Sequence, residues 1–177
     1  MGSKIRIGAL ISGGGSNLQA IIDACEAGRI EAEVAFVGSD QPKVKGLARA
    51  RRHNIPSFVV AYGPIIASYA RDPAGFALPD DFRLDEIGAK QHLLAAGAAK
   101  DRVRAFLCTR AAAEQRLLAE IDRHQPVDLL VLAGFMRIIG PGVLDPFEGR
   151  IINLHPSLLP LHKGTDTYQR ALDAGDR

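Results

Sequence analysis

The chain has 177 residues, of which 47% are hydrophobic and 24% charged, a composition typical of one globular domain with its own core. Lysine and arginine exceed aspartate and glutamate by 22 − 20 = 2, so no broad positive field points to nucleic acid. No apolar stretch approaches the length of a membrane span, and Cys25 and Cys108 lie too far apart to suggest a zinc site or a disulfide framework. We therefore expect a cytoplasmic protein with neither nucleic acid nor membrane as a partner.

The first predicted unit is a strand, a glycine loop and a helix. Residues 4–11 are mostly aliphatic, as in a strand that is covered on both faces. Three glycines follow, and Ser16 with Gln19 has the spacing of a capping box at the start of a helix. Apolar residues recur at helical spacing after this point, and Gly28 stands where a helix would end.

The alternation of strands and helices continues along the chain. Further strands are predicted for residues 32–38, 57–61, 127–133 and 150–154, and helices for residues 43–53, 110–124 and 165–174, with Thr109 as the N-cap of the second of these helices. Residues 62–104 interrupt the rhythm and are interpreted as an insertion that carries one helix. The pattern predicts a single α/β domain over residues 1–177, a Rossmann-like three-layer sandwich with a mostly parallel central sheet.

The glycine loop is the first candidate for a functional site. Ser12-Gly13-Gly14-Gly15-Ser16-Asn17 joins the first predicted strand to the first predicted helix. Glycines let backbone N–H groups approach an anion, and the N-terminus of a helix carries partial positive charge. The loop lacks the lysine of a Walker motif and the third glycine of a dinucleotide fingerprint. It therefore fits either a phosphate site or a tight turn between strand and helix.

A second candidate lies where the last predicted strand ends. Asn153 and His155 are two residues apart, so an extended backbone would send both side chains to the same side. An asparagine amide and a histidine near neutral pH suit a reaction that builds negative charge on a carbonyl oxygen while a proton moves. The competing interpretation is a histidine that merely bonds to neighbouring backbone.

A third stretch, Ala133-Gly134-Phe135-Met136-Arg137-Ile138-Ile139-Gly140, follows the central predicted strand. Its apolar side chains and free backbone groups could hold a flat heterocycle, and core packing would explain the same residues.

Together these three stretches, in this order, resemble glycinamide ribonucleotide formyltransferases. The resemblance rests on the runs Ile11-Ser12-Gly13-Gly14-Gly15-Ser16-Asn17-Leu18-Gln19-Ala20-Ile21, Ala133-Gly134-Phe135-Met136-Arg137-Ile138 and Asn153-Leu154-His155-Pro156-Ser157-Leu158-Leu159-Pro160. It covers the chain from Lys4 to its end, apart from residues 62–104. It implies transfer of a formyl group from the co-substrate 10-formyltetrahydrofolate to the amine of glycinamide ribonucleotide in purine biosynthesis, without a metal, by a monomer or a homodimer.

The resemblance also implies roles for particular residues. The ribonucleotide phosphate would bind at Gly15, Ser16 and Asn17, the folate at Arg110, Met136, Arg137, Ile138, Ile139 and Asn153, and catalysis would depend on Asn153 and His155. Members of the family have a third catalytic residue, an aspartate, in a segment beyond the position of Arg177, together with further strands of the sheet. Without that carboxylate we expect a less readily protonated His155 and impaired catalysis by residues 1–177 alone.

Other functions stay open at this point. Formyltetrahydrofolate deformylase and methionyl-tRNA formyltransferase share the formyl-folate chemistry, and Pro156 and the loop at Ser12 favour the ribonucleotide enzyme. A nucleotide-binding module without catalytic activity, or an inactive fragment, is the alternative of a different class.

Overall fold

A parallel five-stranded sheet forms the centre of the molecule, as seen in a computed structural model that describes residues 3–90, 99–154, 169 and 173–174. Its strands are β1 (Ile5–Ile11), β2 (Ala32–Ser39), β3 (Ser57–Val59), β4 (Leu129–Leu132) and β5 (Ile151–Asn153), in the spatial order β3-β2-β1-β4-β5. Every neighbouring pair is parallel. The helices are α1 (Ser16–Glu26), α2 (Lys45–Arg52), α3 (Tyr62–Arg71), α4 (Leu84–Lys90), α5 (Lys100–Asp122) and α6 (Pro141–Leu144).

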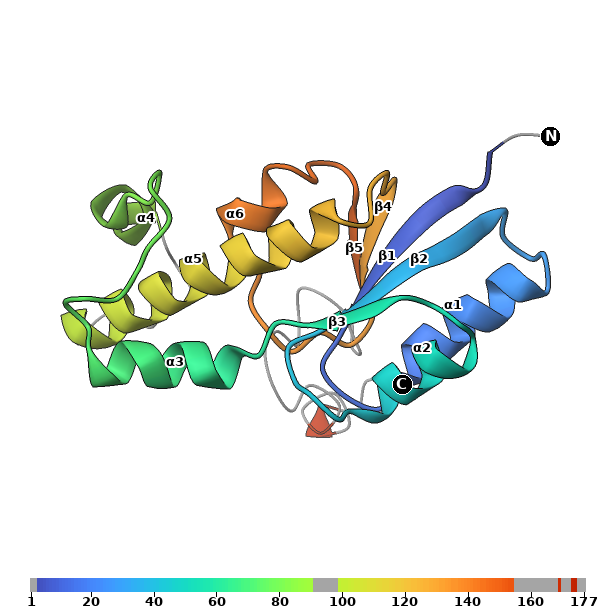
Figure 1. Cartoon of the computed structure of the whole chain (residues 1–177), viewed down its shortest axis with the longest axis horizontal. Helices are drawn as coiled ribbons and strands as arrows, with labels where there is room; N and C mark the ends of the chain where they lie inside the picture. Colours follow the sequence, from blue (N-terminus) through green and yellow to red (C-terminus); the bar gives the residue numbers. More distant parts are fainter. Residues whose placement is uncertain (1–2, 91–98, 155–168, 170–172, 175–177) are drawn as a thin grey trace.

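Helices cover both faces of this sheet (Figure 1). Because successive side chains of a strand point to opposite faces, β1 feeds two separate cores. Leu10 packs with Phe36 and with apolar residues of α3, α5 and α6, whereas Ile11 packs with residues of α1 and α2 such as Leu18 and Ala50. These two cores make a three-layer sandwich, so the predicted Rossmann-like α/β fold is confirmed.

The segment that interrupts the sequence pattern is more helical than predicted. Residues 62–104 contain α3, α4 and the first turn of α5, where only one helix was expected. Both α3 and α4 pack against α5, and α4 and the beginning of α5 lie away from the sheet (Figure 1). Within the part of the chain that the structure describes, no helix combines the length and the apolar character needed to cross a membrane.

Two predicted helix caps are wrong, for identifiable reasons. Helix α5 begins at Lys100, so Thr109 lies inside it, and its hydroxyl donates to the carbonyl oxygen of Ala105 at 2.7 Å. A threonine can bond within a helix as easily as it caps one, and its position alone does not distinguish the two. At α1 the N-cap is Gly15, without a side-chain cap bond, and the Gln19 side chain instead bonds to Asp23.

Candidate active site

Apart from Arg110, the predicted site residues that the structure describes lie at the carboxyl ends of three neighbouring strands. In a parallel sheet these ends share one edge, where ligands of such folds bind. The glycine loop leaves β1, the stretch with Met136 leaves β4, and Asn153 is the last residue of β5. Since β4 lies between β1 and β5, three stretches that are far apart in the sequence meet at this edge.

Direct contacts join the glycine loop to the stretch after β4. The Ser12 N–H donates to the Gly134 carbonyl oxygen at 3.1 Å, and the Met136 N–H donates to the Ser12 hydroxyl at 2.7 Å. The Asn17 amide lies beside Gly134, since a Cβ added to Gly134 would be 4.0 Å from Asn17 Nδ2. The two predicted binding stretches are therefore parts of one surface, and buried Ser12 links them.

The glycine loop presents backbone N–H donors at the start of α1. Gly15 has φ of 72°, a left-handed conformation that a residue with a side chain adopts only at a cost. Among the described residues, none accepts a hydrogen bond from the backbone N–H groups of residues 13–18. These N–H groups stand at the start of α1, where the helix dipole favours negative charge. The loop therefore has the form of an anion site.

The stretch after β4 is held in place by a buried carboxylate. Arg137 Nε donates to Asp40 Oδ2 at 2.6 Å, and the Asp40 side chain has no exposed surface. The Arg137 guanidinium also lies over the Tyr62 ring, 5.0 Å from its centroid, and burial raises the pKa of the Tyr62 hydroxyl. With Arg137 turned inward, Met136 is 73% exposed and Ile138 45% exposed, so an apolar surface remains at the edge of the sheet.

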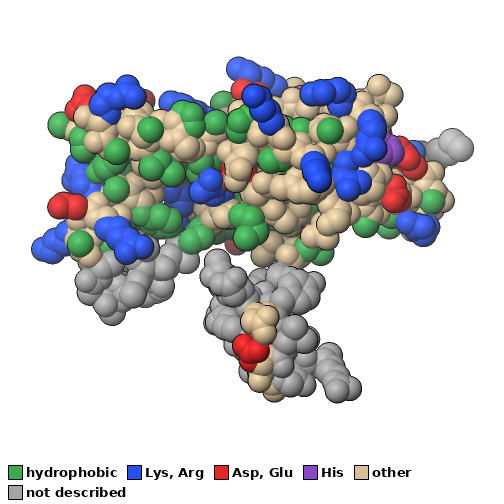
Figure 2. Space-filling model, turned by 90° about the horizontal axis from the view of Figure 1, so that it is seen from below, with side chains coloured by type: hydrophobic (Ala, Val, Ile, Leu, Met, Phe, Trp, Pro, Cys, Tyr) green, Lys and Arg blue, Asp and Glu red, His purple; other side chains and the backbone are tan. Residues whose placement is uncertain are grey.

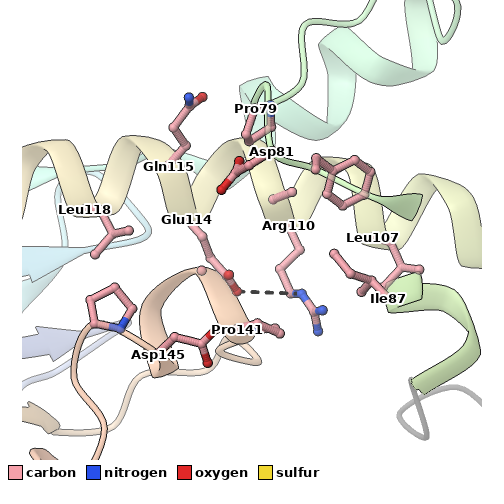
Figure 3. A pocket seen from close by; sticks show the side chains of 14 residues that line it. Pro79, Asp81, Ile87, Leu107, Arg110, Glu114, Gln115, Leu118, Pro141 and Asp145 are labelled. Atoms are coloured by element: carbon pink, nitrogen blue, oxygen red, sulfur yellow. Dashed lines mark ion pairs between the residues drawn. The ribbon is translucent and has the colours of Figure 1, made fainter. Parts of the chain in front are cut away.

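Arg110 lies on the α5 side of the sheet, in a buried charged pair. Its side chain is only 9% exposed, and Nε is 3.6 Å from Glu114 Oε1 (Figure 3). The same carboxylate oxygen accepts from the Gly140 N–H at 2.5 Å. Glu114 thus connects Arg110 to the residue that follows Ile139. Burial raises the pKa of the Glu114 carboxyl, and the two glycine N–H groups and Arg110 oppose that shift.

A cavity of about 500 Å³ opens beside this pair. Its walls come from α4, α5, α6 and the turn before α4, and include Pro79, Phe82, Ile87, Arg110, Glu114 and Pro141 (Figure 3). Apolar side chains make up most of the wall, which also carries the Arg110 guanidinium and the carboxylates of Asp81, Glu114 and Asp145. Arg110 lines this cavity and forms no hydrogen bond or ion pair with the glycine loop or with Asn153.

Of the predicted catalytic pair, the structure describes one member. Asn153 pairs with Leu132 in the sheet, and its side chain is exposed at the edge. His155 lies outside the described residues, as does most of the helix predicted for residues 165–174. The convergence of Asn153 and His155 therefore stays a prediction.

Sequence reasoning missed several residues that shape the site: Ser12 as a link, Asp40, Tyr62, Glu114 and Arg49. Asp40 carried the clearest signal, because a carboxylate directly after a buried strand lies at the ligand-binding edge of a parallel sheet. The others act through contacts between distant segments, which spacing in the sequence does not reveal.

Comparison with known proteins agrees with this arrangement. Residues 5–177 match the family model described as formyl transferase. The phosphoribosylglycinamide formyltransferase of Escherichia coli (strain K12) is 36% identical over 172 residues, which are 97% of this chain and 61% of that protein. The crystal structure of glycinamide ribonucleotide transformylase 1 from Geobacillus kaustophilus is 32% identical and superposes with a TM-score of 0.63, covering 97% of this chain and 69% of that one.

A formyltetrahydrofolate deformylase structure from Pseudomonas putida superposes with a TM-score of 0.60, but at 20% identity this shows a shared fold only. The chain spans about 60% of the length of the curated formyltransferases that it matches. The matched family model covers nearly the whole chain, including the loop at Ser12, the stretch after β4 and Asn153. The chain therefore belongs to the formyl transferase family.

Proposed function

We propose that this chain takes part in transferring a formyl group from 10-formyltetrahydrofolate to the amine of glycinamide ribonucleotide, a step of purine biosynthesis. The observation that carries the proposal is the meeting of a glycine loop at a helix N-terminus and an exposed apolar stretch at one sheet edge. The E. coli and G. kaustophilus proteins, by their names, act on this ribonucleotide.

The ribonucleotide phosphate binds at Gly15, Ser16 and Asn17. N–H groups at a helix N-terminus that have no acceptor among the described residues favour a dianion, and the Ser16 and Asn17 side chains add polar groups there. The folate ring lies against Met136, Arg137, Ile138 and Ile139, whose apolar side chains and backbone groups suit a flat heterocycle. Arg110 takes part in folate binding from the α5 side, where its positive charge suits a carboxylate of the co-substrate.

The chemistry follows from the groups at the end of β5. The amine nitrogen attacks the formyl carbon, and negative charge develops on the formyl oxygen. Asn153 donates a hydrogen bond to that oxygen, and a protonated His155 stabilises the same charge. When the tetrahedral intermediate collapses, the bond from the formyl carbon to folate N10 breaks, and the proton lost by the amine passes to N10 through His155.

The proposal also covers the partners, the location and the oligomeric state of the protein. The partners are two small molecules, with neither nucleic acid nor membrane involved, and the protein works in the cytoplasm as a monomer or a homodimer. The proposed mechanism requires no metal, because side-chain donors stabilise the oxyanion.

A direct assay tests this proposal. The protein is supplied with glycinamide ribonucleotide and 10-formyltetrahydrofolate, and both the formylated ribonucleotide and free formate are measured by mass spectrometry. We expect formylated ribonucleotide, formed more slowly by residues 1–177 alone than by family members that carry the third catalytic residue, a carboxylate. Asn153→Ala should lower the rate further, by about 10²-fold or more, as for loss of one oxyanion donor. Formate without formylated amine would identify a deformylase instead, and binding without turnover a non-catalytic module.

A further inference from the structure

Helix α2 forms hydrogen bonds to the backbone of the glycine loop. The Gly46 N–H donates to the Gly13 carbonyl oxygen at 3.0 Å, and Arg49 Nε donates to the Gly14 carbonyl oxygen at 2.9 Å. Two successive carbonyl groups of the loop are thereby bonded to a helix that follows the next strand. We call Gly46 and Arg49 together the loop clamp.

Arg49 also ties the loop to the first turn of α1. Its Nη1 donates to Gln19 Oε1 at 3.1 Å, and the Gln19 N–H donates to the Gly15 carbonyl oxygen at 2.9 Å. The fit is close, because a Cβ added to Gly15 would lie 2.7 Å from the Gly46 Cα and 3.4 Å from Arg49 Cδ. One guanidinium group therefore joins the loop, α1 and α2.

The clamp determines which way the loop's N–H groups point. In a planar trans peptide the C=O of one residue and the N–H of the next point in opposite directions. Because the Gly13 carbonyl group is bonded to α2, the N–H of Gly14 points away from α2. Because the Gly14 carbonyl group is bonded to Arg49, the N–H of Gly15 also points away from α2. Both N–H groups are without an acceptor among the described residues.

We propose that Arg49 is a positioning residue for the phosphate site. By holding the Gly14 carbonyl, it fixes the Gly15 N–H in the direction that a phosphate needs, before any ligand arrives. Its positive charge lies next to the loop and adds to the attraction for a dianion. This inference rests on the proposed function, in which the ribonucleotide phosphate binds at Gly15, Ser16 and Asn17.

The same helix offers a matched control. Helix α2 carries the basic residues Lys45, Arg49, Arg51 and Arg52. Figure 2 shows Lys and Arg side chains gathered around a histidine at one end of the molecule. Arg51 is exposed and its side chain forms no ion pair or hydrogen bond with a described residue. Arg51→Gln removes the same charge from the same helix without touching the loop.

The experiment compares Arg49→Gln, Arg49→Lys and Arg51→Gln, each checked for an unchanged fold by circular dichroism. Calorimetry gives Kd for glycinamide ribonucleotide and for its dephosphorylated riboside. We expect Arg49→Gln to weaken ribonucleotide binding about tenfold and Arg51→Gln less than about twofold, with little effect of either on the riboside. Arg49→Lys should recover part of the loss, because lysine keeps the charge but cannot bond to Gly14 and Gln19 at once.

A second measurement needs no substrate. NMR order parameters of the backbone report directly on how firmly the N–H bonds of Gly14 and Gly15 are oriented. Arg49→Gln should lower these order parameters in the free protein, and Arg51→Gln should leave them unchanged. Unchanged order parameters in Arg49→Gln, or equal losses of affinity in Arg49→Gln and Arg51→Gln, would overturn the positioning role.

Failure of the proposed substrate is distinguishable from failure of this inference. If the unaltered protein bound no glycinamide ribonucleotide, the proposed function would be wrong, and inorganic phosphate, followed by ³¹P NMR, would replace it as the probe. Weaker phosphate binding by Arg49→Gln than by Arg51→Gln would still support the role of Arg49. Absence of phosphate binding in the unaltered protein would contradict the proposed role of Arg49.

Discussion

The two faces of the sheet contribute to the candidate site in different ways. On the α1 and α2 side, backbone groups dominate: Gly15 allows a left-handed turn, and the loop presents N–H groups at a helix start. On the α5 and α6 side, side-chain charges dominate, with Arg110 and Glu114 buried together beside a cavity. A site made of backbone groups needs only a short glycine motif, whereas a buried charged pair depends on residues that pack around it from distant segments. The α1 and α2 side of the site could therefore be predicted from the sequence, and the α5 and α6 side could not.

The largest expected effect comes from breaking the charged pair. Arg110→Met leaves Glu114 buried beside Gly140 without its cation, and we expect a loss of about 3 kcal/mol of unfolding free energy near pH 8. The double variant Arg110→Met with Glu114→Gln should recover most of this loss, because the glutamine oxygen still accepts from the Gly140 N–H. Urea unfolding measures both. A double variant as unstable as the single one would show that packing, and not charge, determines stability on the α5 and α6 side.

A smaller effect is expected at the glycine loop. Gly15→Ala forces a side chain into the left-handed region and against Gly46, which should cost about 1–2 kcal/mol and prevent ribonucleotide binding. Gly14→Ala is the control, since a Cβ there meets no atom within 4 Å. Thermal unfolding and calorimetry compare the two. Equal effects of both substitutions would contradict a special role for the Gly15 conformation.

The smallest expected effect is a pH dependence of stability. Burial raises the pKa of Glu114 above its unfolded value, so the folded state takes up this proton more readily. The resulting stabilisation is fully present below the unfolded pKa and is lost as pH rises through the raised folded pKa. Stability of the unaltered protein relative to Glu114→Gln should therefore fall as pH rises, in unfolding curves recorded between pH 4 and 8. If the stability of the unaltered protein relative to Glu114→Gln stayed constant or grew with pH, the raised pKa of Glu114 would be contradicted.

The difference between the two sides of the sheet also explains which parts of the fold and the site could be predicted from the sequence. The strands and the sandwich followed from apolar runs between turn signals, and the anion loop followed from Gly13-Gly14-Gly15 before a helix. Thr109 was misplaced because a threonine bonds inside a helix as well as at its start.

Two further features needed the folded structure. Gln19 fitted a capping box, but in the structure its side chain bonds to Asp23 and Arg49. The pairing of Asp40 with Arg137 joins the segments that follow β2 and β4, two strands that are not neighbours in the sheet. No local pattern reports such a contact between distant segments.

The central claim is that ribonucleotide and folate bind side by side at the carboxyl edge of the sheet. NMR chemical shifts of the backbone amides, recorded with each ligand in turn, test it most directly. We predict that glycinamide ribonucleotide shifts the amides of Gly15, Ser16 and Asn17, and that a non-reactive 10-formyl folate analogue shifts those of Met136 and Ile138. Shifts from both ligands confined to the α5 and α6 cavity, with the amides of the glycine loop unchanged, would contradict the account.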